Sequence, residues 1–485
     1  MKARCVMVLG TTSGAGKSWL TTALCRHYAQ QGLKVVPYKA QNMSNNARVV
    51  QGGEIGSAQY FQALAARASP DVRMNPLLLK PEADTRSQVV LMGRVSDELS
   101  AMPWRGRSLR VWPQLAAALD ALRAENDVVV IEGAGSPAEI NLHDSDVVNM
   151  RVALHAGARC LLVTDIDRGG AFAHLYGTWA LLPSEERALI QGFVLNRFRG
   201  DASLLAPAPQ QLQALTGVPT VATLPMWWQH GLPEEDGVFD DRSRATGPVT
   251  KTVAVIAYPR ISNLDEFQPL KNVPGVRLVW ARTPADCADA DWIVLPGSKS
   301  TAADLDWLRG QGLDRAVASH AARGGAVLGV CGGLQMLGEA LIDTHGIDGN
   351  APGLGLLPLV TQFERDKTVR HVQSRFEDVR GCWSALAGVS AAGYEIHHGQ
   401  TAQHPAMAAA GDLAHAVLPG GLGWQNAAGN VLGVYLHGLF EDPQVLHALF
   451  GASAPTLETV FDGLADFIRL HFEPGVLDRL LAPAP

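Results

Sequence analysis

The chain has 485 residues, too many for one domain, and its 47% hydrophobic and 18% charged residues are typical of folded globular proteins. A net charge of −7 without a basic block argues against a nucleic-acid partner, and the sequence offers no run of about 18 apolar residues to cross a membrane. The six dispersed cysteines form neither a disulfide framework nor a zinc motif. We therefore expect a cytoplasmic enzyme with reduced thiols that acts on small molecules, and we leave open whether it forms a homo-oligomer.

Short apolar runs alternate with helical patterns along the chain, which favours an α/β fold of parallel sheets covered by helices. A polar segment separates two sets of runs and is followed at once by a new strand. This organisation predicts a first domain over 1–240, a linker over 241–251, a second domain over 252–447 and a helical tail over 448–485. The expected strands are 5–9, 34–39, 128–131, 160–164, 191–195, 252–257, 292–296 and 326–330.

The first strand runs into GTTSGAGKSWLTTAL (10–24), a glycine-rich loop that opens a helix. Gly14 and Gly16 allow the backbone N–H groups to cradle phosphates, Lys17 can reach the terminal phosphates, and Ser18 can bind Mg²⁺. The motif therefore predicts ATP and Mg²⁺. Its spacing is one residue longer than the usual GxxxxGK[ST] and resembles the P-loop of dethiobiotin synthetases, which activate a carboxylate with ATP.

Two acidic residues of this domain are candidate Mg²⁺ ligands. Glu132 ends a buried strand in IEGAGSPAEIN (131–141), and we expect the end of this strand to lie near the nucleotide, where a carboxylate can bind Mg²⁺. The alternative is a capping role in a glycine turn. Glu54, in GGEIGSAQ, is a second candidate. Asn196 ends a later strand, where it either contacts the base or shapes a turn.

Three polar residues lie at or just after the end of the second strand, KVVPYK (34–39), and are candidates for substrate binding. Lys39 stands where a lysine can bind a carboxylate or stabilise a transferring phosphoryl group, although a surface lysine fits the same pattern. Gln41 and Asn42 begin the polar run 41–46, which is hard to explain by packing. We expect this run to line the substrate site, with a solvated loop as the alternative.

The second domain carries a cysteine at a sharp bend. The strand AVLGV (326–330) is followed by Cys331, a Gly332–Gly333 pair and a helix, an order typical of a nucleophile elbow. The N-terminus of the helix favours the thiolate, and the Gly332 N–H can stabilise an oxyanion. The alternative is a buried cysteine that only fills space.

The segment GVCGGLQ (329–335) matches the G-x-C-x-G-x-Q pattern and resembles class I glutamine amidotransferases. The resemblance implies that Gln335 helps to bind glutamine and that Ser298, in PGSKST, supplies the second oxyanion N–H. It also implies that His437, which ends the strand before HGLFED, is the general base. The expected second domain is therefore a flavodoxin-like glutamine amidotransferase domain with Cys331 as its nucleophile.

The third member of the expected catalytic triad is not identified by the sequence. The usual glutamate stands two residues after the histidine, where this chain has Leu439. Glu441 and Glu395 are the nearest alternatives, and neither fits the pattern. The sequence therefore predicts a Cys331–His437 dyad with an open third position.

There is a chemical reason for one chain to carry both an ATP site and a glutaminase site. Phosphorylation by ATP turns a carboxylate into an acyl phosphate with a good leaving group, and ammonia then attacks it to give an amide. Free ammonia is mostly protonated at neutral pH, so a glutaminase on the same chain can supply it unprotonated. Cys331 would form a glutamyl thioester and release that ammonia.

Nearly the whole chain resembles the cobyric and cobyrinic acid amidating synthases of cobalamin biosynthesis. The resemblance implies a dethiobiotin-synthetase-like P-loop domain joined to a class I glutamine amidotransferase domain. It also implies ATP- and glutamine-dependent amidation, with Mg²⁺, of the b, d, e and g carboxylates of a corrinoid, adenosylcobyrinic acid a,c-diamide. The segments that carry the resemblance are YKAQNMSNNA (38–47), GGEIGSAQ (52–59), MNPLLLKP (74–81), IEGAGSPAEINL (131–142), NRFRGD (196–201), PGSKST (296–301), GVCGGLQMLG (329–338) and YEIHHG (394–399).

Three other functions compete with this one. The preceding enzyme of the pathway, which makes the a,c-diamide, shares the glycine-rich loop and the cysteine bend, but not the segments YKAQNMSNNA and PGSKST. Amidation of a cell-wall carboxylate would require a different ATP domain, one like that of the Mur ligases. A non-catalytic switch ATPase with a degenerate second domain conflicts with the presence of Cys331, Gln335 and His437.

Overall fold

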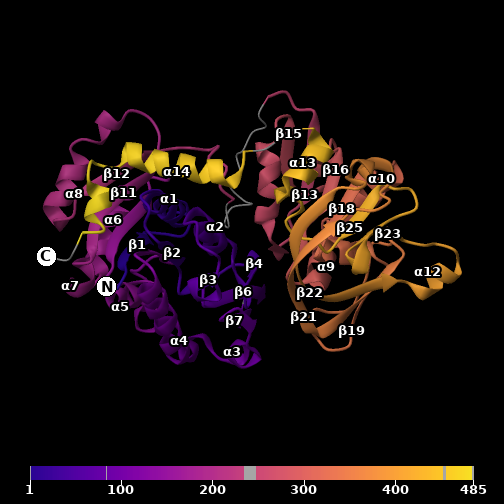
Figure 1. The fold of residues 1–485 in the computed structure, drawn as a ribbon, viewed down its shortest axis with the longest axis horizontal. Coiled ribbons are helices and arrows are strands. Elements are labelled where there is room, and N and C mark those ends of the chain that lie inside the picture. The colour runs from indigo at the N-terminus through magenta and orange to yellow at the C-terminus, as the bar shows by residue number, and fades with distance from the viewer. Residues whose placement is uncertain (1, 84, 234–246, 452–454, 483–485) are drawn as a thin grey trace.

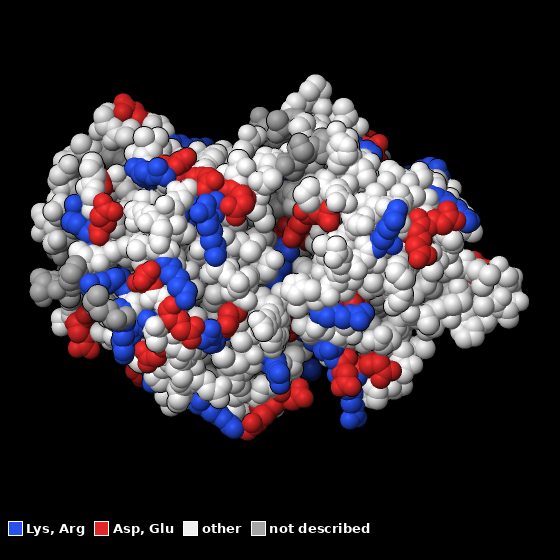
Figure 2. Space-filling view, in the orientation of Figure 1, with Lys and Arg blue, Asp and Glu red and all other residues white. Residues whose placement is uncertain are grey.

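The computed structural model describes residues 2–83, 85–233, 247–451 and 455–482. Figure 1 shows two lobes, one formed by the N-terminal half together with the C-terminal tail and the other by residues from about 250 to 450. Residues 241–246 of the predicted linker lie outside the described residues. In Figure 2 acidic and basic side chains are interspersed over the visible face. The described helices include none that is long and apolar enough to cross a membrane.

The first lobe is built on a six-stranded sheet in which all neighbouring strands are parallel. The sequence predicts this because its strands are continuous apolar runs, which suit a sheet that is buried on both faces. The order is β12 (Thr220–Pro225), β11 (Ile190–Phe198), β10 (Arg159–Asp165), β1 (Arg4–Gly10), β9 (Val128–Glu132) and β2 (Val35–Tyr38).

Helices cover this sheet, and two small sheets extend it towards the second lobe (Figure 1). The helices are α1 (Lys17–Gln30), α2 (Ser57–Ala65), α3 (Asp97–Ala101), α4 (Trp104–Glu125), α5 (Met150–Ala156), α6 (Ala171–Leu181), α7 (Ser184–Arg187) and α8 (Ala208–Thr216). One small sheet has the order β3 (Gln41–Met43), β6 (Leu77–Ala83), β7 (Arg86–Leu91) and β8 (Arg94–Val95), and the other pairs β4 (Ala47–Val50) with β5 (Gly53–Gly56).

The second lobe contains a seven-stranded sheet whose first five strands are parallel. The last two strands are antiparallel and close one edge. The order is β15 (Val276–Ala281), β13 (Lys251–Ile256), β16 (Trp292–Leu295), β18 (Ala326–Val330), β25 (Val431–Val434), β24 (Gly423–Gln425) and β23 (His415–Leu418).

Helices and a second, mostly antiparallel sheet flank this core. The helices are α9 (Thr301–Gly310), α10 (Leu313–Ala322), α11 (Gly332–Leu337), α12 (Pro405–Ala409) and α13 (Pro443–Phe450), with the 3-10 helix η4 (Leu264–Asn272). The second sheet has the order β20 (Ala351–Pro352), β19 (Ala340–Asp343), β21 (Leu359–Arg375) and β22 (Ser390–Gln403), and β14 (Ile261–Ser262) pairs with β17 (Gly297–Ser298).

The predicted helical tail returns to the first lobe. Its main helix, α14 (Leu457–His471), packs Phe461, Leu464 and Ile468 into the core beside α1, and α15 (Val476–Arg479) follows it. Figure 1 shows α14 across the top of that lobe. Helix α13 runs past residue 447, and Leu449 and Phe450 pack on the core of the second lobe. The C-terminal tail is therefore part of the first lobe, although it follows the second lobe in sequence.

The expected parallel α/β architecture of both halves is confirmed, and every predicted strand matches an observed one within a few residues. The reactive segments follow the carboxyl ends of parallel strands, because the glycine-rich loop follows β1 and Cys331 follows β18. Ligands of open α/β sheets bind at this edge.

Candidate functional sites

The glycine-rich loop joins β1 to α1 and has the shape of a phosphate cradle. Gly14 and Gly16 have φ values of 71° and 100°, in the left-handed region that favours glycine. A Cβ atom at Gly16 would lie 2.0 Å from Nδ2 of Asn196, so only glycine fits there. Lys17 begins the helix, and its Nζ donates to the carbonyl oxygens of Thr12 at 3.0 Å and Gly135 at 3.2 Å.

Glu132 lies at the centre of the polar groups next to the loop. Its Oε1 accepts from Ser18 Oγ and from Lys39 Nζ, each at 2.8 Å, and its Oε2 accepts from Gln62 Nε2. Burial raises the pKa of Glu132, but Lys39 and the hydrogen bonds from Gln62 and Ser18 outweigh this effect, so the pKa lies below its ordinary value. The carboxylate is therefore ionised although it is fully buried.

A cavity of ≈ 1410 Å³ opens beside these groups and exceeds the usual range of small-ligand pockets, roughly 300–1,000 Å³. Gln41 and Asn42 line it, and so do Trp227 and Trp228, which the sequence analysis left outside every site. The other predicted residues on its wall are Gly14, Gly16, Lys17, Ser18, Lys39, Glu132 and Asn196. The cavity is thus larger than a pocket for one small ligand.

Asn196 is held by the loop, whereas Glu54 lies elsewhere. Asn196 donates from Nδ2 to the carbonyl oxygen of Ala15 at 2.9 Å, which favours a role in shaping the loop. Glu54 is not brought to Ser18 and Glu132. Its carboxylate pairs with Lys80 and Lys367, each at 2.6 Å, and these lysines hold its pKa well below the ordinary range despite burial. The structure therefore gives Glu54 two lysine partners and does not bring this candidate metal ligand to the Ser18–Glu132 cluster.

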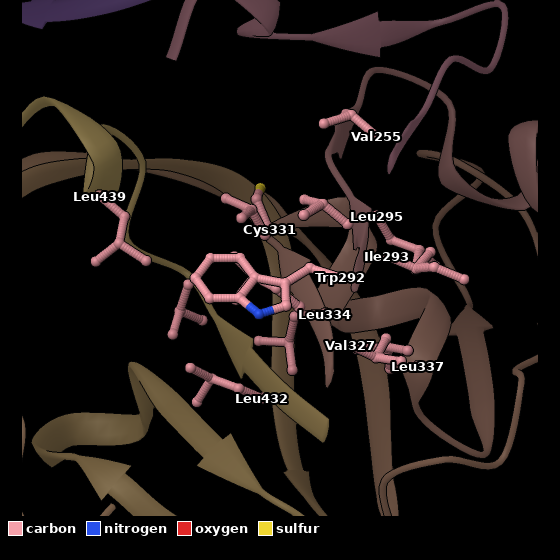
Figure 3. Close-up of a cluster of buried hydrophobic side chains, with 14 of the residues drawn as sticks. Val255, Trp292, Ile293, Leu295, Val327, Cys331, Leu334, Leu337, Leu432 and Leu439 are labelled. Carbon is pink, nitrogen blue, oxygen red and sulfur yellow. The ribbon is translucent and has the colours of Figure 1, made fainter. Parts of the chain in front are cut away.

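Cys331 stands at the bend between β18 and α11 in a strained conformation. Its φ is 51°, in the left-handed region that non-glycine residues rarely adopt. The bend is tight because Gly333 approaches the backbone closely: a Cβ atom there would lie 1.8 Å from the carbonyl oxygen of Leu295. In Figure 3 Cys331 lies at the edge of the apolar cluster, with Leu295 beside it in this view. The geometry agrees with the expected nucleophile elbow.

The predicted oxyanion donors are adjacent to one another. A Cβ atom on Gly332 would lie 2.7 Å from the backbone nitrogen of Ser298, so the two backbones approach closely beside Cys331. Gln335 is buried, with its Oε1 accepting from Thr301 Oγ1 and its Nε2 donating to the Tyr435 hydroxyl, each at 3.2 Å. Its side chain is therefore held in one orientation.

His437 contacts both the nucleophile and a carboxylate that the sequence analysis missed. Its Nδ1 lies 3.0 Å from Oε1 of Glu266, whose Oε2 accepts from the backbone nitrogen of Gly438 at 2.8 Å. Burial lowers the pKa of His437, but Glu266 and the hydrogen-bonded Cys331 raise it to about 10. The arrangement is a Cys–His–Glu triad whose glutamate lies 171 residues before the histidine.

The earlier candidates for the third position have other partners. Glu441 binds Arg48, and Glu395 binds Arg370 and His397. Leu439 packs within the same apolar cluster as Cys331 (Figure 3). The only sequence signal for Glu266 is an acidic pair, 265–266, in an otherwise buried segment of η4.

Two family models match the chain, one on each half. Residues 6–233 match the CobQ/CobB/MinD/ParA nucleotide binding domain. Residues 252–445 match the CobB/CobQ-like glutamine amidotransferase domain. The two matches agree with the two predicted domain types and with the two sites described above.

Curated relatives align over nearly the full length. A cobyric acid synthase of Variovorax paradoxus (strain S110) is 80% identical, with 99% of this chain and 100% of the relative covered. Another, of Polaromonas naphthalenivorans (strain CJ2), is 78% identical with the same coverage. A third, of Acidovorax ebreus (strain TPSY), is 77% identical over 99% of both chains.

Proposed function

Because this chain belongs to the cobyric acid synthase family, we propose that it amidates the b, d, e and g carboxylates of adenosylcobyrinic acid a,c-diamide. It is a glutamine-dependent amidotransferase. The observation that carries the proposal is the pairing of sites: a buried Ser18–Glu132–Lys39 cluster at a large cavity, and a Cys–His–Glu triad on the same chain.

In the glutaminase half, the sulfur of Cys331 attacks the side-chain amide carbon of glutamine while the proton is held on His437, whose raised pKa favours the imidazolium form. The negative oxygen that forms is stabilised by the backbone N–H groups of Ser298 and Gly332. His437 then protonates the leaving nitrogen, so that ammonia departs and a glutamyl thioester remains. Water hydrolyses the thioester to glutamate. Glu266 holds the imidazole in place and stabilises its charged form throughout.

In the nucleotide half, the P-loop N–H groups and Lys17 bind the phosphates of ATP. A carboxylate oxygen of the corrinoid attacks the γ-phosphorus, ADP leaves, and an acyl phosphate forms. Lys39 neutralises the charge that develops on the transferring group. Gln41 and Asn42 bind the corrinoid edge, and the two tryptophans of the cavity wall face its apolar ring. Ammonia attacks the acyl carbon and expels phosphate.

The residues at the nucleotide site fit a Mg²⁺ ion. Mg²⁺ prefers hard oxygen ligands and is often bound by one carboxylate together with substrate phosphates. The hydroxyl of Ser18 and the ionised carboxylate of Glu132 lie within one hydrogen bond of each other and form such a donor set. When bound, the ion would neutralise phosphate charge, while Lys39 continues to hold the Glu132 carboxylate in position.

Product mass tests the substrate assignment. The purified protein is incubated with Mg-ATP, glutamine and either adenosylcobyrinic acid a,c-diamide or cobyrinic acid. We expect successive carboxylate-to-amide mass steps on the a,c-diamide only. Amidation of cobyrinic acid alone would favour the preceding enzyme of the pathway, and consumption of glutamine and ATP with both corrinoids unchanged would remove the substrate assignment but keep the two-site mechanism.

A further inference from the structure

Arg48 extends from the nucleotide domain into the glutaminase domain. It lies on β4, directly after the polar run 41–46, and only 2% of the residue is exposed. Its Nη1 and Nη2 donate to Oε2 and Oε1 of Glu441 at 2.8 and 2.5 Å, and Nη2 also pairs with Asp265. One arginine of the first domain therefore neutralises two carboxylates of the second.

Both carboxylates are next to the catalytic triad. Asp265 directly precedes Glu266 on η4, and Glu441 ends the 3-10 helix η8 (Leu439–Glu441), which begins just after His437. The ring of Tyr394 contacts both sides of this arrangement: the guanidinium carbon of Arg48 lies 5.2 Å from its centroid, and the His437 ring stacks on it at 5.3 Å. The arginine is thus one side chain away from the general base.

Further contacts hold the beginning of η4 against the nucleotide domain. The backbone nitrogen of Leu264 donates to Oδ1 of Asn46 at 2.9 Å, and the backbone nitrogen of Ala47 donates to Oδ1 of Asn263 at 3.2 Å. Nδ2 of Asn263 donates to the Tyr394 hydroxyl at 3.0 Å. The element that carries the catalytic glutamate is therefore fixed by residues of both domains.

The other end of η4 reaches the large cavity. Gln268, Lys271 and Asn272 line that cavity together with Lys17 of the P-loop. The same 3-10 helix presents Glu266 to His437 near its beginning. A single element of nine residues thus joins the glutaminase centre to the wall of the synthase cavity.

We propose that Arg48 is a positioning residue of the glutaminase: it fixes η4 and η8 so that Glu266 orients His437, and it makes glutamine hydrolysis depend on the docked nucleotide domain. This inference rests on the proposed function and concerns its glutaminase step. Arg48 acts through its two carboxylate partners. Without its guanidinium, the buried Asp265 and the partly exposed Glu441 would lose their counter-charge, so the two carboxylates would separate or draw in water and η4 would shift.

The test compares two nitrogen sources in the full-length protein. In Arg48→Met, amidation with glutamine is expected to fall by about 10²-fold, because a small misplacement of a catalytic group has an effect of that order. Amidation with ammonium salt, which bypasses the triad, is expected to stay within about twofold of the wild type. Glutamine hydrolysis and labelling of Cys331 by a diazoketone analogue of glutamine should fall with the glutamine-dependent rate.

Two variants serve as controls. Arg26 is also a buried arginine with two carboxylate partners, Glu458 at 2.5 Å and Asp462 at 2.7 Å. All three lie in the first lobe, because the two partners are on α14, which packs there. Arg26→Met should lower the melting temperature without changing the ratio of the glutamine- to the ammonium-dependent rate. Arg48→Lys keeps the charge but not the two-pronged geometry, so it should restore part of the lost ratio.

Three outcomes would overturn the proposal: equal loss with both nitrogen sources in Arg48→Met, no loss with either, or the same change of ratio in Arg26→Met. If Arg48→Met does not fold, the ratio measured in Arg48→Lys decides the question in the same way. If the wild type leaves the corrinoid unchanged, the substrate assignment fails, while the glutamine hydrolysis and Cys331 labelling rates still test Arg48.

Discussion

The glycine-rich loop after β1 carries its glycines and its reactive lysine within a few residues of sequence, although Lys17 donates both to the carbonyl oxygen of Thr12 in the loop and to that of Gly135, 118 residues away. The cysteine at the bend after β18 depends on distant segments instead. Its general base, His437, follows β25, and the glutamate that orients His437 lies on η4. The phosphate-binding residues are thus contiguous in sequence, although later segments contact the loop, whereas the three catalytic side chains of the cysteine centre come from three separate segments. Displacement of η4 should therefore affect the glutaminase more than the nucleotide site.

The largest expected effect comes from Glu266→Gln. Loss of the carboxylate leaves the imidazolium of His437 without its partner, so kcat for glutamine hydrolysis should fall by roughly 10²–10⁴-fold, the range seen when an orienting carboxylate is removed from a triad. Ammonium-dependent amidation should be nearly unchanged. The matched control is Glu186→Gln, which removes a carboxylate from another histidine pair, with His143 at 3.0 Å, in the first lobe. A variant of Glu266 with normal glutamine hydrolysis would refute the triad.

The opposite pattern is expected for Glu132→Gln. This change removes the carboxylate shared by Ser18 and Lys39, so amidation should fall by about 10²–10³-fold with glutamine and with ammonium salt alike. Glutamine hydrolysis should be affected much less. Measuring ATP consumption, glutamine hydrolysis and amide formation in one preparation separates the two sites, and a selective loss of the glutamine-dependent rate would contradict the assignment of Glu132.

A smaller effect is expected on the pH dependence of stability. The pKa of His437 is raised from 6.5 to about 10 in the folded protein, because Glu266 and Cys331 outweigh the effect of burial. Its contribution to the free energy of unfolding is therefore complete below pH 6.5 and is lost as the pH rises towards 10. Urea unfolding of the wild type and Glu266→Gln should show a stability difference that shrinks across this window. A difference that grows with pH would contradict the ion pair.

Sequence patterns located the strands and the two bends because these features are local. A continuous apolar run predicts a buried strand, and the glycine spacing around Lys17 and Cys331 predicts a turn with a defined shape. His437 could also be predicted, since it follows an apolar strand pattern in the expected order after the cysteine. These predictions depend on a few neighbouring residues, and the structure places them as expected.

The rest depends on contacts between distant segments. Glu266 becomes a triad member only because η4 packs beside the end of β25, and no spacing rule links it to a histidine 171 residues away. The ion pair of Glu54 with Lys367 could not be predicted either, because Lys367 lies 313 residues away and belongs to the other lobe. Arg48, in turn, follows a polar run whose letters give no sign of two carboxylates across a domain interface.

The most direct test of the two-site account is amide formation by Cys331→Ala with each nitrogen source. With Mg-ATP, the a,c-diamide corrinoid and glutamine, the variant should form no amide, because no thioester can form. With ammonium salt in place of glutamine, it should form amide at a rate close to that of the wild type under the same conditions. Glutamine-dependent amidation by this variant, or failure with ammonium salt in a folded preparation, would contradict the account.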